Sequence, residues 1–421
     1  MNMGVFPVCC RSALHFLLTL LSLSGGVTIV DIFTPGEGGT VAFRIPGLLA
    51  IPAGALNGSS PAVLLAVAEG RLEGCGDFNG LHTVVAKRSL DGGHSWSALH
   101  TLLDPRTVYG TDTCPLNSTD GGCEFWDPTP VFDHLTGDIL LLATHSRTSK
   151  QRMSGRLDLW LLRSHDLGLT WATPENITQQ VVTPEGVMTP GNGHATQLSS
   201  GRLLVAGYMR PDGDGSEFCA TIASDDHGLT WHMQQASRAA GMGTSECEVA
   251  ELCLSANVGS RGSNECHTVV VMDERMNRNA QEARGGCGHG VPLCRWRSYS
   301  DDEGATWRAL SPQPALPDPG CKGGFTAWRS RGIDGGDALL VSNAASTTSR
   351  ENITLHISYD GGTTWPSAQA RLLSRAGGYS DVQVIIGHTA TPNIEQNGTD
   401  YAAVLYEVNS CGGIRLALTK I

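Results

Sequence analysis

Short apolar runs, separated by glycine, proline and polar residues, recur along the whole chain. The first run after the N-terminal segment is Val27–Phe33, and the last is Ile414–Ile421. Apolar runs of this length, bounded by turn residues, are typical of β-strands rather than helices. We therefore expect an all-β protein with many short strands, in which the last strand pairs into the sheet that holds the first.

One eight-residue pattern, Ser-x-Asp-x-Gly-x-Thr/Ser-Trp, interrupts these runs five times. The copies begin at Ser89, Ser164, Ser224, Ser300 and Ser358. In each copy the Asp can accept backbone N–H bonds and the Gly can take a positive φ, while the Trp can pack between sheets. The pattern therefore predicts a tight turn between two antiparallel strands in each repeat.

The spacing of the five copies predicts the architecture. They lie roughly 67 residues apart on average, which is too long for a two-helix repeat and fits a four-stranded propeller blade with its loops. Dividing residues 26–421 by this spacing gives about six blades. We expect one domain over residues 26–421, an all-β six-bladed β-propeller with five such turns, although a fold alone does not give a function.

Residues 1–25 have the layout of a signal peptide. Arg11 precedes an apolar run, Ala13–Leu23, that is followed by small residues and is too short for a permanent membrane anchor. No later segment has the ~20 consecutive apolar residues of a membrane helix. Five Asn-x-Ser/Thr sequons agree with entry into the secretory pathway, at Asn57, Asn117, Asn176, Asn352 and Asn397.

Cysteine usage indicates the same oxidising compartment. The chain has 13 cysteines, and eleven remain once Cys9 and Cys10 leave with the signal peptide. Cys114 with Cys123, and Cys287 with Cys294, are spaced as disulfide staples of loops. The odd total leaves at least one cysteine unpaired within the chain, or paired with another molecule. Because the Cys and His residues lack paired short spacings, we expect no metal site and no cofactor.

The net charge of −12 and the pI near 5.6 argue against nucleic acids and anionic membrane surfaces as partners. An anionic substrate would need a local cluster of arginines, held against this overall field. Arg44 is the first candidate, because it stands in the apolar stretch VAFRIPGLLAI, where burying an unpaired arginine is costly. A structural arginine paired with a core glutamate is the alternative.

The FRIP sequence around Arg44, followed by the five octamers, resembles the exo-α-sialidases (neuraminidases), in which the octamer is called the Asp box. The resemblance implies that Arg44 binds the carboxylate of sialic acid. It also implies that Asp77 is the general acid, and that Glu69 and Arg71 line the pocket near the 4-position of the sugar. A general acid must hold a proton, so we expect the loop to desolvate Asp77 and raise its pKa.

The same resemblance assigns roles further along the chain. It implies that Glu246 is the base that activates the nucleophile, and that Arg275 and Arg350 complete an arginine triad around the carboxylate. Nearby residues compete for these roles, namely Glu248, Glu251, Glu274 and Arg278. Trp126 and Asp127 could also face the pocket, although a turn and packing between blades explain them better.

Tyr379, in the sequence AGGYSDVQV, matches the nucleophile of the sialidases. A neutral phenol suits an anomeric carbon that bears a carboxylate, because an Asp or Glu nucleophile would approach against like charge. Sialidases with a Tyr nucleophile are known exceptions to the two-carboxylate mechanism. Glu407, in VLYEVNSCGG, matches the glutamate that orients the first arginine, here Arg44.

These matches predict a retaining exo-α-sialidase that acts on glycoproteins, oligosaccharides and gangliosides through a covalent tyrosyl intermediate. Two other functions stay open: a trans-sialidase of the same fold, and a non-catalytic lectin that binds sialic acid. A lectin would have no need of Tyr379 or Asp77. The resemblance places the protein in the lysosomal lumen or outside the cell, and it allows for protein partners in the lysosome.

Overall fold

The computed structural model describes most of the chain. The described residues are 21–23, 26–56, 58, 60–78, 80–116, 122–148, 151–152, 154, 157–211, 217–234, 243–255, 266–387, 399–409 and 411–421. Most of the expected signal peptide, and the sequons at Asn57, Asn117 and Asn397, lie outside these residues.

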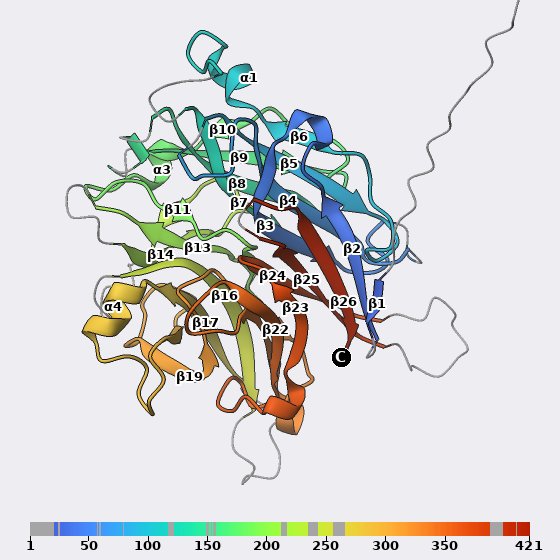
Figure 1. Ribbon diagram of the computed structural model, residues 1–421, viewed down its shortest axis with the longest axis vertical. Coiled ribbons are helices and arrows are strands. Elements are labelled where there is room, and N and C mark those ends of the chain that lie inside the picture. The colour runs from blue at the N-terminus through green and yellow to red at the C-terminus, as the bar shows by residue number, and fades with distance from the viewer. Residues whose placement is uncertain are drawn as a thin grey trace, which may run out of the picture.

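One sheet joins the two ends of the chain. Its strands are ordered β1-β2-β26-β25-β24. They are β1 (Leu21–Leu23), β2 (Val27–Phe33), β24 (Ser380–Ile385), β25 (Tyr401–Glu407) and β26 (Ile414–Lys420). Because β2 pairs with β26, the blue first strand of the domain lies beside the red last strand in Figure 1. The predicted closure of the fold by its terminal strands is confirmed.

The first two repeats form a continuous sheet of eight strands, ordered β10-β9-β8-β7-β5-β4-β3, with β6 paired to β5. The strands are β3 (Ala42–Ile51), β4 (Val63–Arg71), β5 (His82–Ser89), β6 (His100–Leu103), β7 (Glu124–Phe132), β8 (Ile139–Ser146), β9 (Asp158–Ser164) and β10 (Glu175–Asn176). Its two antiparallel halves, β3–β6 and β7–β10, are joined by the parallel pairing of His82 with Glu124.

Three more sheets follow around the ring. The third holds β11 (Thr189–Pro190), β12 (Thr196–Gln197), β13 (Leu203–Met209), β14 (Phe218–Ser224) and β15 (His232–Met233). The fourth holds β16 (Thr244–Ser255), β17 (Cys266–Met276), β18 (Cys294–Ser300) and β19 (Ser311–Pro317). The fifth holds β20 (Gly324–Trp328), β21 (Ala338–Ala344), β22 (Glu351–Ser358) and β23 (Arg371–Ala376).

Helices are few and short in the described residues. They are α1 (Pro105–Tyr109), α3 (Thr178–Val181), α4 (Arg278–Ala283) and the 3-10 turns η1 (Glu37–Gly39), η3 (Ile333–Gly335) and η4 (Ser367–Gln369). The all-β expectation is therefore confirmed. In the part of the chain that the structure covers, no helix is long and apolar enough to span a membrane.

The number of sheets differs from the prediction. The described strands hydrogen-bond into five sheets, whereas the repeat spacing predicts six separate blades. The reason is the pairing of His82 with Glu124, which merges the first two four-stranded units into one sheet. A count based on spacing assumes that each repeat pairs only within itself, and that assumption fails here.

All five Asp boxes connect the last two strands of a four-stranded unit. In the third box the Asp226 carboxylate accepts the Thr230 N–H at 2.8 Å, and Ser224 Oγ accepts the Gly228 N–H at 2.8 Å. Each Trp that ends a box packs into a different apolar cluster between neighbouring four-stranded units, for example Trp231 between the second and third units. The boxes thus close turns and also join sheets, as predicted.

The disulfides agree with an oxidising compartment. The predicted pairs Cys114–Cys123 and Cys287–Cys294 are both present. Two longer-range bonds were not predicted, Cys75–Cys411 and Cys219–Cys247. Cys253 is disulfide-bonded as well, and Cys321 is a buried free cysteine among the described residues. The odd cysteine expected from the count is therefore Cys321.

Candidate active site

Three strands carry a bulge near their N-terminal ends, where the candidate residues gather. The pairing register shifts between Arg44 and Gly47 in β3, between Trp126 and Thr129 in β7, and between Ser245 and Glu248 in β16. Within these bulges Ile45, Asp127 and Glu246 have φ of 59°, 52° and 48°. Positive φ is uncommon outside glycine, and bulges of this kind redirect side chains near functional sites.

Tyr379, Glu246 and Arg275 are in direct contact although they come from three parts of the chain. Tyr379 Oη donates a hydrogen bond to Glu246 Oε1 at 2.5 Å. Arg275 Nη1 donates to Tyr379 Oη at 2.8 Å and also pairs with Glu246 Oε2. The hydroxyl of Tyr379 therefore lies between a carboxylate and a guanidinium. The expected pairing of Glu246 with the tyrosine is present.

The electrostatics keep the proton of this pair on the tyrosine. Burial raises the pKa of Tyr379 well above its usual value, although Arg275 partly opposes this effect. Burial would also raise the pKa of Glu246, but Arg275 and the hydrogen bond from Tyr379 outweigh it and lower that pKa. The free site therefore holds a neutral phenol beside an ionised carboxylate, which is the starting state of a base-activated nucleophile.

The three predicted arginines surround the ring of Tyr379. The guanidinium carbons of Arg44, Arg275 and Arg350 lie 5.3, 5.9 and 4.9 Å from the ring centroid. Arg350 is exposed, and it forms no ion pair within the described residues. Arg278, the alternative to Arg275, instead donates to the carbonyls of Thr347 and Thr348. The geometry therefore favours Arg275 over Arg278.

Arg44 is held by two carboxylates. Its Nε lies 3.1 Å from Glu407 Oε1, and its Nη1 lies 2.8 Å from Asp77 Oδ1. Glu407 is fully buried and also accepts the backbone N–H groups of Ile45 at 3.0 Å and Tyr379 at 3.2 Å. A single carboxylate thus fixes both the first arginine and the tyrosine segment. Glu407 contacts Arg44 as the resemblance implies.

The expected rise in the pKa of Asp77 is wrong for this state of the site. Burial would raise this pKa, but the attraction of Arg71, Arg44 and Arg152 lowers it to about 2. Half of the Asp77 side chain is exposed, so desolvation is incomplete and three cations prevail. In this structure Asp77 is an ionised partner of Arg44 and Arg71, and it cannot donate a proton until those contacts change.

Glu69 and Arg71 form an ion pair beside Asp77. Both side chains are fully buried, and Arg71 Nη2 lies 2.7 Å from Glu69 Oε2. Arg71 also lies 2.9 Å from Asp77, and Glu69 accepts the backbone N–H of Asp127 at 3.0 Å. Arg71 therefore contacts the loop of Asp77, while the Glu69 carboxylate binds Arg71 and the backbone of the β7 bulge.

Known proteins resemble this chain in sequence and in fold. Residues 63–405 match the BNR repeat-like domain family, which covers well over half of the chain. A Sialidase-3 from Bos taurus is 30% identical over 333 residues, covering 72% of this chain and 66% of the relative. The chain belongs to the sialidase family.

Other sialidases match at somewhat lower identity. A sialidase from Bacteroides fragilis is 28% identical over 275 residues, covering 62% of this chain and 45% of the relative. The solved structure of a Hadza microbial sialidase, Hz136, has a TM-score of 0.72 and 25% identity, covering 93% of this chain and 68% of that structure. The chain thus spans between about half and two thirds of these sialidases, and the structural likeness supports the propeller arrangement.

Arg152 also lies at this sialidase-family site, although the sequence did not indicate it. Its Nη1 donates to the backbone carbonyl of Asp77 at 2.6 Å and to Glu124 Oε2 at 2.7 Å. Its guanidinium lies 4.0 Å from the ring centroid of Trp126 and 4.9 Å from that of Phe78. Arg152 belongs to no recognisable motif, so only its spatial neighbours reveal it.

Asp127, for which the sequence favours packing over a role in the pocket, is buried beside the site. Its carboxylate accepts hydrogen bonds from Tyr208 Oη at 3.1 Å and Asn192 Nδ2 at 3.2 Å. Burial and the neighbouring Glu69 raise the pKa of Asp127 to about 8. Glu124, next to Arg152, has its pKa raised to about 8 by burial. Both carboxyls are therefore candidates for neutral hydrogen-bonding groups in this sialidase-family site.

A buried charge cluster lies between the inner strands. His194 Nδ1 is 2.9 Å from Asp381 and 2.8 Å from Glu248, and Lys322 Nζ is 3.2 Å from Glu248. The histidine and two carboxylates are metal-ligating residue types, but the Lys322 ammonium already supplies a cation beside them. We assign the cluster to the fold, because the Lys322 ammonium also donates to the carbonyl of Ser380, next to Tyr379, at 3.2 Å.

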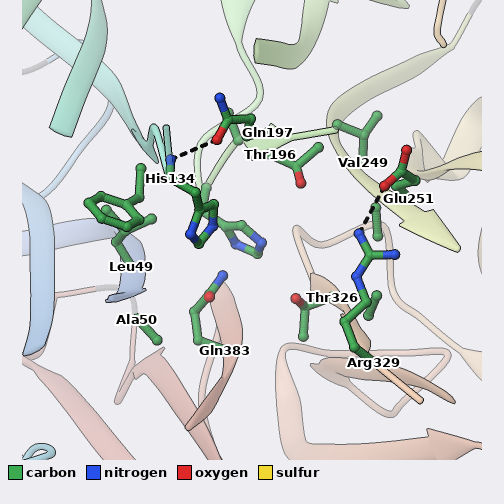
Figure 2. A pocket seen from close by; sticks show the side chains of 15 residues that line it. Leu49, Ala50, His134, Thr196, Gln197, Val249, Glu251, Thr326, Arg329 and Gln383 are labelled. Atoms are coloured by element: carbon green, nitrogen blue, oxygen red, sulfur yellow. Dashed lines mark hydrogen bonds and ion pairs between the residues drawn. The ribbon is translucent and has the colours of Figure 1, made fainter. Parts of the chain in front are cut away.

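A separate cavity of about 160 Å³ lies further along the same inner strands (Figure 2). Leu49 of β3, Val249 of β16 and Gln383 of β24 line it, each several residues further along the chain than Arg44, Glu246 or Tyr379. At about 3.3 Å of rise per residue, Arg44 and Leu49 are separated by roughly 16 Å along β3. None of the predicted site residues lines this cavity, so it is distinct from the sialidase-family site.

Proposed function

We propose that the chain is a retaining exo-α-sialidase that releases terminal α-linked sialic acids from glycoproteins, oligosaccharides and gangliosides. The main support is the hydrogen bond from Tyr379 to Glu246 inside a group of three arginines. A phenol paired with a base and surrounded by cations suits attack on an anomeric carbon that bears a carboxylate.

In this proposal Arg44, Arg275 and Arg350 bind the carboxylate of the sugar. A planar carboxylate can accept a bidentate fork from one guanidinium and single bonds from two others. Arg350, which forms no ion pair among the described residues, has its guanidinium free for the ligand. Glu407 holds Arg44 in place from the buried side.

Tyr379 is the proposed nucleophile and Glu246 its base. When the substrate carboxylate binds Arg275, the lowering effect of that arginine on the pKa of Glu246 weakens. Glu246 then accepts the phenolic proton more readily while Tyr379 Oη bonds to the anomeric carbon. Water subsequently cleaves the tyrosyl intermediate, and two inversions give net retention.

Asp77 is the proposed general acid, and it has to be released first. In the free site its carboxylate occupies Arg44, where the substrate carboxylate would bind. The two anions compete for one guanidinium, so substrate binding separates Asp77 from Arg44 and raises its pKa. Arg71, supported by Glu69, continues to hold the loop, and the protonated Asp77 donates to the leaving oxygen.

We also propose that the chain enters the secretory pathway, since its disulfides form and persist in oxidising compartments. The lysosomal lumen and the extracellular space both meet this requirement. Residues 1–25 are the proposed signal peptide.

Proton NMR of sialyllactose incubated with the protein tests the activity. We expect lactose and free sialic acid, with the α-anomer formed first and mutarotation following. Early appearance of the β-anomer would show inversion and remove the covalent mechanism. Sialic acid on a new acceptor would show transfer, and binding without release would show a lectin.

A further inference from the structure

We propose that the Cys75–Cys411 disulfide positions the general acid, because it ties the loop that holds Asp77 to the turn that follows Glu407. The proposal rests on the proposed sialidase function and adds Cys75 and Cys411 to it as positioning residues. Neither cysteine touches the substrate.

The disulfide joins two segments, each of which carries a carboxylate that contacts Arg44. Cys75 lies in the loop between β4 and β5, two residues before Asp77, and Cys411 lies in the turn between β25 and β26, four residues after Glu407. The two Cα atoms are 5.2 Å apart across a sequence separation of 336. Because Asp77 and Glu407 are the two carboxylates bound to Arg44, the bond fixes the acid relative to the group that orients this arginine.

The Cys411 end of the bond is anchored. The backbone N–H of Val408 donates to the carbonyl of Gly413 at 3.0 Å, which closes the turn at its base. The N–H of Cys411 donates to Asn409 Oδ1 at 3.1 Å. The turn follows directly on β25, which pairs with both β24 and β26. A tether to this turn is therefore a tether to the closing sheet.

The Asp77 end is less constrained by its own backbone. Two hydrogen bonds close the base of the loop. The Leu72 N–H donates to the Leu81 carbonyl at 3.0 Å, and the Leu81 N–H donates to the Glu73 carboxylate at 2.8 Å. Toward the tip, two arginines hold the loop backbone: Arg71 donates to the Cys75 carbonyl at 2.6 Å, and Arg152 donates to the Asp77 carbonyl at 2.6 Å. The loop also contains Gly74, Gly76 and Gly80, which favour mobility.

The disulfide matters most when catalysis begins. In the free site, ion pairs with Arg44 and Arg71 hold the Asp77 carboxylate directly. Substrate binding takes Arg44, and protonation of Asp77 removes the charge that both arginines attract. The covalent bond through Cys75 is not affected by either event. It therefore keeps Asp77 near the leaving oxygen at the step where a misplacement of about 1 Å costs on the order of 100-fold in rate.

The test separates acid positioning from general stabilisation through the leaving group. The double variant Cys75→Ser/Cys411→Ser is compared with wild type on sialyllactose, which needs a proton donor, and on an aryl sialoside whose phenol leaves unaided. We expect kcat/KM to fall by about tenfold or more on sialyllactose and much less on the aryl sialoside. Equal losses on both substrates would mean that the disulfide only stabilises the fold, and would overturn the proposal.

Two controls sharpen the result. Cys287→Ser/Cys294→Ser removes a disulfide outside the loop of Asp77, in a cluster with Met276 and Trp296, so the ratio of the two activities should not change. In an Asp77→Asn background, removing Cys75–Cys411 should cause no further loss on sialyllactose, since the acid is already absent. Additive losses in that background would contradict the proposal.

A second variant covers the case in which the cysteine variant does not fold. Inserting two glycines on each side of Cys411 keeps both cysteines and lengthens the tether to β25 as well as to β26. We expect the same selective loss on sialyllactose, with the disulfide confirmed by peptide mapping. An unchanged ratio of activities, with the bond intact, would overturn the proposal. If wild type released sialic acid from neither substrate, the proposed function itself would have failed, which is a separate outcome.

Discussion

Tyr379 donates a hydrogen bond to Glu246 across a sequence separation of 133 residues, with an oxygen–oxygen distance of 2.5 Å. The two groups differ in protonation because burial raises the pKa of the phenol, whereas Arg275 lowers the pKa of the carboxyl. Two neighbouring groups with pKa values displaced in opposite directions are typical of a donor and acceptor in acid–base catalysis. The pair is the centre of the proposed mechanism.

Replacing Tyr379 with Phe should abolish turnover and leave ligand binding nearly unchanged, because only the reacting oxygen is lost. The measurement is kcat on an activated aryl sialoside, with a binding titration of a sialic-acid analogue as the control for folding. A Tyr379→Phe variant with wild-type kcat would mean that another residue is the nucleophile.

Replacing Arg44, Arg275 or Arg350 with Ala should weaken binding of a sialic-acid analogue by about 1.5–3 kcal/mol each, the usual cost of losing a hydrogen bond to a charged group. Lysine should restore little, since it lacks the planar fork. Wild type should discriminate strongly against the methyl ester of the analogue, and the variants should not. Arg278→Ala is the matched control, because this exposed arginine donates to Thr347 and Thr348. Full discrimination by Arg275→Ala would remove Arg275 from the triad.

Binding of a carboxylate ligand should take up a proton at Asp77. The pKa of this group is lowered to about 2 in the free site, and losing the contact with Arg44 raises it. Between the free and the bound pKa the complex holds more protons, so affinity should increase as the pH falls through that window. Calorimetric titrations near pH 4 to 5, in buffers of different ionisation enthalpy, measure the uptake. Asp77→Asn should abolish the buffer dependence, and a wild type without such dependence would contradict the competition for Arg44.

Lys322→Met should destabilise the fold by about 3–5 kcal/mol, because it leaves the buried carboxylates of Glu248 and Asp381 with less compensating charge. Urea unfolding measures the loss. Lys87→Met is the control: Lys87 pairs with Glu37 nearer the surface, where an ion pair contributes about 1 kcal/mol or less. Similar losses for both lysines would show that the cluster is not a special contributor to stability.

The sequence by itself determined the repeats, the strand-rich fold and most of the candidate residues. The Asp box is a local pattern, since its Ser, Asp, Gly and Thr contact one another within a few residues, as Asp226 and Thr230 do. Such patterns can be read without any knowledge of distant parts of the chain. The loop staples Cys114–Cys123 and Cys287–Cys294 were predictable for the same reason.

Tertiary structure alone decided the properties that depend on distant neighbours. Arg152 stands in no motif, and Cys75 finds Cys411 only because the first unit and the closing sheet are adjacent in the ring. The ionisation of Asp77 was predicted with the wrong sign, since the sequence does not reveal that Arg44, Arg71 and Arg152 converge on it. The single pairing of His82 with Glu124 likewise changed the number of sheets. Electrostatic attraction and strand pairing act through space, so a linear pattern cannot fix either of them.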